Sequence, residues 1–359
     1  MKNLDESTKK MLRTFGLLVG AIVALFIILF IFMGLSGKKV GDTQLVNSIE
    51  NAAKRYYTTN KDKLPKKEGE TVKVTTDTLI SEKYLKSFDK LTKNTGCSGE
   101  VKVTNNGGEY LYNPSLKCSE YKTTTIKDKI ESTLVSSGEG LYKEGSEYYY
   151  RGEYVDNYIK IANTVYRVVS IDKNGYVKVI NPNVKPSNQQ WDNRYNTELT
   201  ANGVGVNDYE KSRLREFIDS YYEGLDTKTK AYIVKHNWCV GKRAISNTNF
   251  NANECNKTYN SFLGTLLPSE YVRVSTDSLC KNIKDGACSN YNYLKKILPG
   301  TWTSIGVTDN TYEVMAFGGT SIYYTDASDS ADVAIAFNIS GNNLYVSGDG
   351  TETSPYVIR

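Results

Sequence analysis

The sequence predicts an α+β protein, in which an N-terminal transmembrane helix precedes a small α+β domain and a larger β-rich, disulfide-stapled α+β domain. Three observations predict this fold class. Residues 15–35 are an uncharged apolar run, and about 20 apolar residues span a bilayer as a helix. The chain has 28 tyrosines among 359 residues and is rich in Thr, Asn and Gly, which favour strands joined by tight turns. Its 6 cysteines all follow the apolar run.

The apolar run has the length of a membrane anchor. A secretory signal has a shorter apolar stretch of about 7–15 residues, followed by a small-residue cleavage site. Here the run continues into Ser36-Gly37-Lys38-Lys39, without such a site. A buried helix of a soluble protein is the other alternative, but a helix without a polar face needs apolar neighbours on every side. We therefore expect an uncleaved anchor in the lipid bilayer.

Basic residues on the two sides of the run predict its orientation. Lys2, Lys9, Lys10 and Arg13 precede the run, and only Lys38 and Lys39 follow it closely. Because the side richer in Lys and Arg tends to stay in the cytoplasm, residues 1–14 are expected to be cytoplasmic. The protein would then be a single-pass plasma-membrane protein with its bulk outside the cell.

The cysteines agree with this orientation, because structural disulfides belong to oxidising compartments. Six cysteines allow 15 pairings. A zinc site would need short C-x₂₋₄-C steps, and the sequence contains none. Proximity along the chain favours the pairs Cys97–Cys118, Cys239–Cys255 and Cys280–Cys288.

A membrane-proximal domain is expected over residues 38–121. Asp42 is placed to cap a helix over residues 43–58, and apolar residues at helical spacing predict a second helix over 77–88. Alternating residues predict a strand over 71–75 and a hairpin of residues 100–104 and 109–113. The hairpin turn is Asn105-Asn106-Gly107-Gly108, a strong turn signal.

This order of a membrane helix, an amphipathic helix and a small sheet with a terminal disulfide resembles a type IV pilin or pseudopilin head. The resemblance implies a pilin-like head and keeps open a pilin-like structural function. The family's processing motif is a glycine followed by Phe-Thr-Leu, with a glutamate nearby. Gly16-Leu17-Leu18-Val19 has neither the Phe-Thr-Leu nor the glutamate.

A Thr-, Ser-, Lys- and Gly-rich segment, residues 122–147, reads as a linker before a larger domain at 148–359. In that domain three strands are expected as a meander, followed by two helices and a long segment, 237–288, that carries four of the cysteines. Short strands return near the C-terminus. The expected strands are 158–161, 164–171, 176–180, 312–317, 321–324, 333–337, 344–346 and 356–358, and the helices are 209–223 and 227–235.

Several motifs of the larger domain resemble uncharacterised single-pass surface proteins of low-GC Gram-positive bacteria. They are Val165-Tyr166-Arg167-Val168-Val169, Trp191-Asp192, Leu266-Leu267-Pro268-Ser269-Glu270-Tyr271, Trp302-Thr303 and Gly348-Asp349-Gly350-Thr351. The resemblance implies a cell-surface location and this architecture, but no activity. A sheet with a packed helix and long disulfide-tied loops is also similar to C-type-lectin-like domains, an analogy of fold that does not determine function.

Residues that signal a reaction are scarce. His236 is the single histidine, no G-x-S-x-G motif occurs, and no catalytic residue or cofactor is expected. Glycoside hydrolysis needs only two carboxyls at the right separation, so the 40 acidic residues leave a cell-wall or glycan hydrolase open. Asp326, Asp329 and Asp332 are the densest acidic cluster, but their spacing is not that of an EF-hand, and a solvated loop is favoured over a calcium site.

Tyrosine clusters are the best sequence sign of a binding surface. Tyr148, Tyr149, Tyr150 and Tyr222 are candidate ligand-binding residues, because tyrosine combines contact area with a hydrogen bond. The alternative is that they pack the core. A net charge of +5 is too small to predict nucleic-acid binding. The favoured function is therefore a membrane-anchored extracellular binding or adhesion protein for a glycan, a cell-wall polymer or a host surface ligand.

Overall fold

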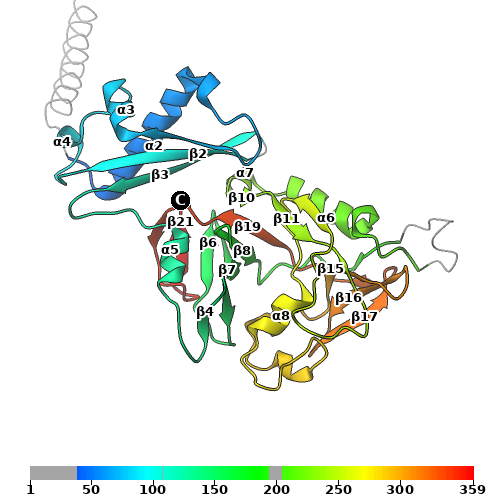
Figure 1. Cartoon of the computed structure of the whole chain (residues 1–359). Helices are drawn as coiled ribbons and strands as arrows, with labels where there is room; N and C mark the ends of the chain where they lie inside the picture. The colour runs from blue at the N-terminus through cyan, green and yellow to red at the C-terminus, as the bar shows by residue number, and fades with distance from the viewer. Residues whose placement is uncertain (1–38, 107, 194–203) are drawn as a thin grey trace, which may run out of the picture. The chain divides into compact units, whose positions relative to one another are not determined.

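The computed structural model describes residues 39–106, 108–193 and 204–359, which form a mixed α+β, β-rich structure with three disulfides (Figure 1). The predicted anchor at residues 15–35 lies outside the described residues. Within those ranges, no helix has the length and apolar character needed to cross a membrane.

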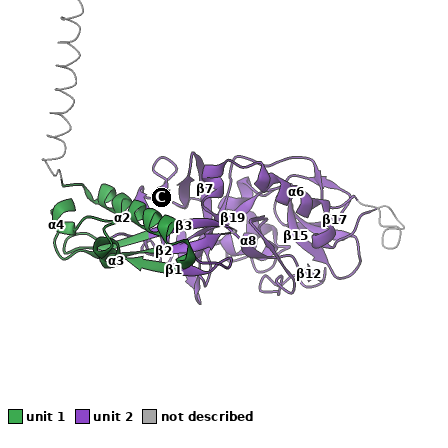
Figure 2. Ribbon diagram, turned by 90° about the horizontal axis from the view of Figure 1, so that it is seen from above, with its two compact units in different colours: residues 1–64, 72–102, 114–122 green, residues 65–71, 103–113, 123–359 purple. Residues whose placement is uncertain are grey.

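The chain divides into two compact units (Figure 2). The first takes its described residues from Met1–Leu64, Val72–Lys102 and Pro114–Lys122. The second consists of Pro65–Thr71, Val103–Asn113 and Thr123–Arg359. The hairpin formed by β2 (Ser98–Asn106) and β3 (Glu109–Lys117) contributes to both units.

The first unit is built on helix α2 (Asp42–Thr59) and a sheet of order β1-β2-β3, in which β1 is Thr71–Thr75. A short 3₁₀ turn, η1 (Lys61–Lys63), follows α2. The predicted helix, strand and hairpin are confirmed, and the Cys97–Cys118 disulfide closes the open end of the hairpin. The buried face of α2 consists of Leu45, Val46, Ile49, Ala52, Ala53, Tyr56 and Tyr57.

The helix predicted over 77–88 is shorter. Helix α3 covers Thr76–Ser81, with Thr75 as its N-cap, and a separate turn, α4, covers Phe88–Leu91. Lys83 has a φ of 65°, and the N–H groups of Tyr84 and Leu85 both donate to the carbonyl of Leu79. This left-handed residue ends the helix and turns the chain.

The main sheet of the second unit contains 10 strands among the described residues, with a path of β10-β19-β8-β7-β6-β21-β20. The predicted meander is confirmed as β6 (Tyr158–Ile161), β7 (Thr164–Ile171) and β8 (Tyr176–Ile180). Strands from the C-terminus, β19 (Ala336–Ser340) and β21 (Tyr356–Ile358), join its two sides, and Figure 1 shows their orange-to-red ribbons beside the green meander. Three further members are β10 (Ile233–Val234), β14 (Leu263–Gly264) and β20 (Tyr345–Ser347), and the remaining two come from residues 140–151.

Residues 122–147 were expected as a linker, but all of them except Lys122 belong to the second unit. They contain α5 (Ile126–Glu131) and β4 (Gly140–Glu144), and β4 pairs with β5 (Glu147–Arg151), which reaches β7. Ile126, Ile130 and Leu141 are fully buried in the core. The spacing of Ile126, Ile130 and Leu134 in the sequence is compatible with a short helix, and three well-spaced apolar side chains are enough to attach so short a segment to a core.

A second sheet has the order β12-β15-β16-β17, formed by Lys242–Arg243, Thr301–Val307, Glu313–Phe317 and Ile322–Asp326. Two small pairs are β11 (His236–Cys239) with β13 (Thr258–Ser261), and β9 (Gln189–Gln190) with β18 (Ser330–Ala331). The predicted helix 209–223 is divided by Ser212 into a 3₁₀ turn, η2 (Tyr209–Lys211), and α6 (Arg213–Glu223). The predicted helix 227–235 ends early, because α7 covers only Thr227–Lys230 before β10 begins.

The segment 237–288 is tied by two disulfides, Cys239–Cys255 and Cys280–Cys288, as proximity predicted. It also contains helix α8 (Pro268–Val274). Two 3₁₀ turns follow it, η3 (Gly286–Ser289) and η4 (Tyr293–Lys296).

Candidate functional site

A cleft of about 690 Å³ lies in the second unit. Its walls come from β5, the β7–β8 turn, β8, β11, β13 and α8. Tyr176 and Lys178 are two residues apart on β8, and His236 and Trp238 are two apart on β11, so each pair points to one side of its strand. All four residues line the cleft.

A short ion pair crosses the cleft. Lys178 Nζ lies 2.6 Å from Glu270 Oε1, and the side chains are 16% and 6% exposed. The other carboxylate oxygen of Glu270 accepts a hydrogen bond from the Leu267 N–H at 2.9 Å. The ammonium also lies 5.2 Å from the centre of the Trp238 ring. The two charges therefore neutralise one another within the site.

His236 packs between aromatic rings, with its centroid 5.6 Å from that of Tyr176 and 6.2 Å from that of Trp238. Its Nε2 lies 3.7 Å from Asp172 Oδ2. Burial lowers the pKa of the imidazole, as does the Lys178 ammonium, whereas Asp172 raises this pKa. The net effect is a lowered pKa, which favours the neutral imidazole.

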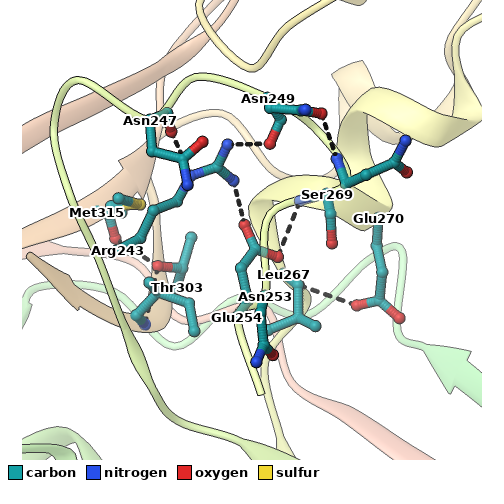
Figure 3. A network of polar contacts seen from close by, with 12 residues as sticks. Arg243, Asn247, Asn249, Asn253, Glu254, Leu267, Ser269, Glu270, Thr303 and Met315 are labelled. Carbon is teal, nitrogen blue, oxygen red and sulfur yellow. Dashed lines mark hydrogen bonds and ion pairs between the residues drawn. The ribbon is translucent and has the colours of Figure 1, made fainter. Parts of the chain in front are cut away.

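Glu254 forms a buried ion pair on another wall of the cleft (Figure 3). Arg243 Nη1 lies 2.5 Å from Glu254 Oε1, and the two side chains are 1% and 2% exposed. Arg243 also donates to the carbonyls of Asn247 and Asn249, and Glu254 accepts from the Ser269 N–H at 3.2 Å. Burial raises the pKa of Glu254, although Ser269 and Arg243 lower it. The pair holds the loop 244–257 against α8.

Two of the three glutamates that line the cleft are engaged in ion pairs. Glu254 is paired with Arg243, and Glu270 with Lys178. A retaining or inverting glycosidase needs one carboxyl as a proton donor and the other as a nucleophile or base. Glu254 and Glu270 are each held instead by a cationic side chain and a main-chain N–H group.

Two polar atoms at the cleft have no hydrogen-bond partner within the described part of the chain, namely Thr265 Oγ1 and Asn338 Nδ2. Their residues are only 2% and 1% exposed. Asn338 lies on β19 opposite Lys178, and Thr265 follows β14, which pairs with the same strand. A buried polar group without a partner costs about 1–3 kcal/mol, and nothing in the described part of the chain offsets this cost at Thr265 and Asn338.

The four candidate tyrosines are not gathered into one surface. Tyr149 lines the cleft, where its hydroxyl donates to Glu147 and the Arg273 guanidinium lies 4.3 Å from its ring centre. Tyr150 is 2% exposed and Tyr148 packs against the same core. Tyr222 stacks on Phe262, with ring centres 4.1 Å apart. Only Tyr149 of these four takes part in the cleft.

The acidic cluster near residue 329 has local partners. The Thr325 hydroxyl donates to Asp329, and the main chain of Asp332 bonds to Gly300 and Trp302. Burial and the Asp329 charge raise the pKa of Asp326. Within the ranges that the structure describes, no group of three or more His, Cys, Asp or Glu side chains is placed to hold a metal ion.

The sequence did not single out Lys178, Glu270, Thr265 or Asn338, because each lies in an ordinary strand, loop or helix and meets the others only through the fold. Comparisons with protein-family models, curated proteins and solved structures found no match to this chain.

Proposed function

We propose that this chain is a membrane-anchored extracellular binding protein whose second unit binds a hydroxyl-rich ligand, such as a glycan, in the cleft. The observation that carries the proposal is the pair of buried, unpartnered groups, Thr265 Oγ1 and Asn338 Nδ2. A ligand hydroxyl both donates and accepts hydrogen bonds, so it satisfies a threonine hydroxyl and an amide N–H equally well.

The rest of the cleft suits the same class of ligand. Sites for small ligands combine aromatic surface with a few polar groups that fix orientation. Tyr149 and Tyr176 supply rings, and the Lys178–Glu270 pair leaves little net charge at the centre. Neutral side chains around them offer amides and hydroxyls, namely Asn174, Asn237, Asn253, Asn260 and Thr258.

The cellular location in this proposal rests on other features. Residues 15–35 have the length of an anchor, and more basic residues precede than follow them. All six cysteines pair, which suits an oxidising compartment. The motif resemblance to Gram-positive surface proteins and the lectin-like analogy also favour an extracellular location.

A direct test uses the full-length chain in mild detergent on a glycan array, followed by affinity and stability measurements with any glycan that binds. Thr265→Val should weaken binding about tenfold, the equivalent of one neutral hydrogen bond, while stability stays equal or rises. The matched control is Thr353→Val, an exposed threonine outside the cleft, which should change neither quantity.

Two results would contradict the ligand proposal. One is an array without any bound glycan. The other is a Thr265→Val variant that loses stability yet binds normally, because the hydroxyl would then have an internal partner. The anchor is tested separately: after an alkaline wash of membranes, the full chain should stay in the pellet and a chain lacking residues 1–37 should not.

A further inference from the structure

A lysine and an asparagine far apart in sequence meet outside the cleft, at the edge of the second sheet. Lys242 Nζ lies 2.5 Å from Asn207 Oδ1, across a sequence separation of 35 residues. Asn207 is only 1% exposed, and Lys242 on β12 is half-buried. The contact joins the segment before η2 to the first strand of that sheet.

The amide nitrogen of Asn207 is surrounded by main-chain carbonyls. Nδ2 donates to Val307 at 3.0 Å, to Asn310 at 3.1 Å and to Glu313 at 2.8 Å. A carboxamide nitrogen has only two hydrogens, so three carbonyl acceptors exceed what it can bond fully. An ammonium ion, with four hydrogens, matches such a group of acceptors better.

The backbone holds the two side chains together. Lys242 pairs with Gly306 in the parallel register of β12 and β15. A Cβ atom at Gly306 would lie 2.8 Å from the carbonyl oxygen of Asn207 and 3.4 Å from its Cγ. The glycine therefore permits the close approach of Asn207 to the strand that carries Lys242.

The charges around Lys242 favour its neutral, nucleophilic form. Burial lowers the pKa of the amine, and the neighbouring Lys257 ammonium lowers it further, against the attraction of Asp208. Asp208 itself lies 3.1 Å from Lys257 and 3.9 Å from Lys211. Asp208 and Lys242 line the same pocket, and this carboxylate is the acidic group whose charge acts on the amine.

We propose that Lys242 and Asn207 form an intramolecular isopeptide bond. Lys242 Nζ attacks Asn207 Cγ, a new C–N bond forms, and the bond from Cγ to Nδ2 breaks. Two protons of the lysine ammonium move to the departing NH₂ group by way of Asp208 or water, so the products are an amide cross-link, whose nitrogen keeps one hydrogen, and an ammonium ion. The three carbonyls around Nδ2 receive that ion, and no oxidant or cofactor is needed.

Such a bond would close a covalent loop over α6, α7, β10 and β11. Lys242 on β12 could then not separate from Asn207 without the amide breaking. This modification is independent of any ligand, so its test does not depend on the binding proposal.

Mass spectrometry of the full-length chain, reduced to open its disulfides, tests this inference. The intact mass should be lower than that of the sequence by one ammonia. A protease digest should contain a branched peptide that joins Lys242 to Asn207, with no cleavage by trypsin after Lys242. A chain with the unmodified mass and linear peptides over both residues would overturn the proposal.

Variants distinguish the cross-link from other reactions that release ammonia. Lys242→Arg should have the intact mass that its own sequence predicts, because a guanidinium does not attack an amide at neutral pH. Lys73→Arg is the matched control, because Lys73 pairs with Glu100 in the first unit whereas Asn207 belongs to the second, and it should keep the lowered mass. A succinimide at Asn174-Gly175 also releases ammonia, so a lowered mass that persists in Lys242→Arg would count against the cross-link.

Discussion

At the scale of single residues, the properties of His236 depend on the side chains that surround it in the fold. His236 is the single histidine of the sequence, and no catalytic role is expected for it from the sequence. In the fold it lies beside Asp172, Tyr176 and Trp238 in the wall of a cleft. Its surroundings stabilise the neutral imidazole, which gives the residue a measurable signature.

The signature is a loss of stability in mild acid. An unfolded histidine has a pKa of about 6.5, and burial lowers the pKa of His236 in the folded chain. Below about pH 6.5 the unfolded state therefore binds a proton more readily than the folded state does, and the free energy of unfolding falls as pH decreases. Each unit by which the pKa differs between the folded and unfolded states changes the free energy of unfolding by about 1.4 kcal/mol.

We expect His236→Gln to flatten this dependence between pH 7 and 5.5. The measurement is the free energy of unfolding in urea at several pH values for both chains. Comparing the two chains cancels the contribution of the carboxyl groups to the pH dependence. One of these groups is Glu254, whose raised pKa makes the free energy of unfolding rise as the pH decreases. Parallel curves for the two chains would show that His236 titrates normally in the folded state.

At the scale of elements, the loop 244–257 forms a wall of the cleft because a buried ion pair and a disulfide hold it. Cys239–Cys255 closes the loop, and Arg243 bonds to Glu254 and to two loop carbonyls. Removing one partner of a buried pair leaves the other charge uncompensated. The pair should therefore matter far more than a surface pair does.

Glu254→Gln should lower the free energy of unfolding by about 3–5 kcal/mol. The matched control is Glu50→Gln on α2, where Glu50 pairs with Lys54 at the surface and the change should cost about 0.5 kcal/mol or less. Chemical denaturation of the three chains measures both values. Equal effects of the two substitutions would mean that the Arg243–Glu254 pair does not anchor the loop.

Strand β15 shows why an element can escape detection in a sequence. All seven residues of Thr301–Val307 are buried, yet three of them are Thr or Ser. Their hydroxyls donate to the carbonyls of Leu298, Met315 and Cys239, at 2.6, 2.8 and 2.9 Å. These hydrogen bonds offset the cost of burying a hydroxyl. Because the acceptors lie outside the strand, the alternation of apolar residues along the sequence does not predict it.

At the scale of the whole molecule, the two units have separate cores and separate disulfides. Cys97–Cys118 lies in the first unit, and Cys239–Cys255 and Cys280–Cys288 lie in the second. A disulfide stabilises mainly by restricting the unfolded chain that it closes, typically by about 2–4 kcal/mol. Each bridge should therefore act on the unit that contains it.

Calorimetry of the full chain should show two unfolding transitions. The double variant Cys97→Ser/Cys118→Ser should lower the temperature of one, and Cys239→Ser/Cys255→Ser should lower that of the other. The two variants serve as controls for one another. If both moved the same transition, the chain would unfold as a single cooperative block.

The sequence by itself determined the features that local physics controls. Helix α2, the β2–β3 hairpin and the β6–β7–β8 meander follow from periodicity and turn residues, and the disulfide pairs follow from proximity along the chain. Only the tertiary structure decided that residues 122–147 join the core and that Thr265, Asn338 and His236 line one cleft. Those outcomes depend on contacts between residues many positions apart, and no local pattern of polarity records them.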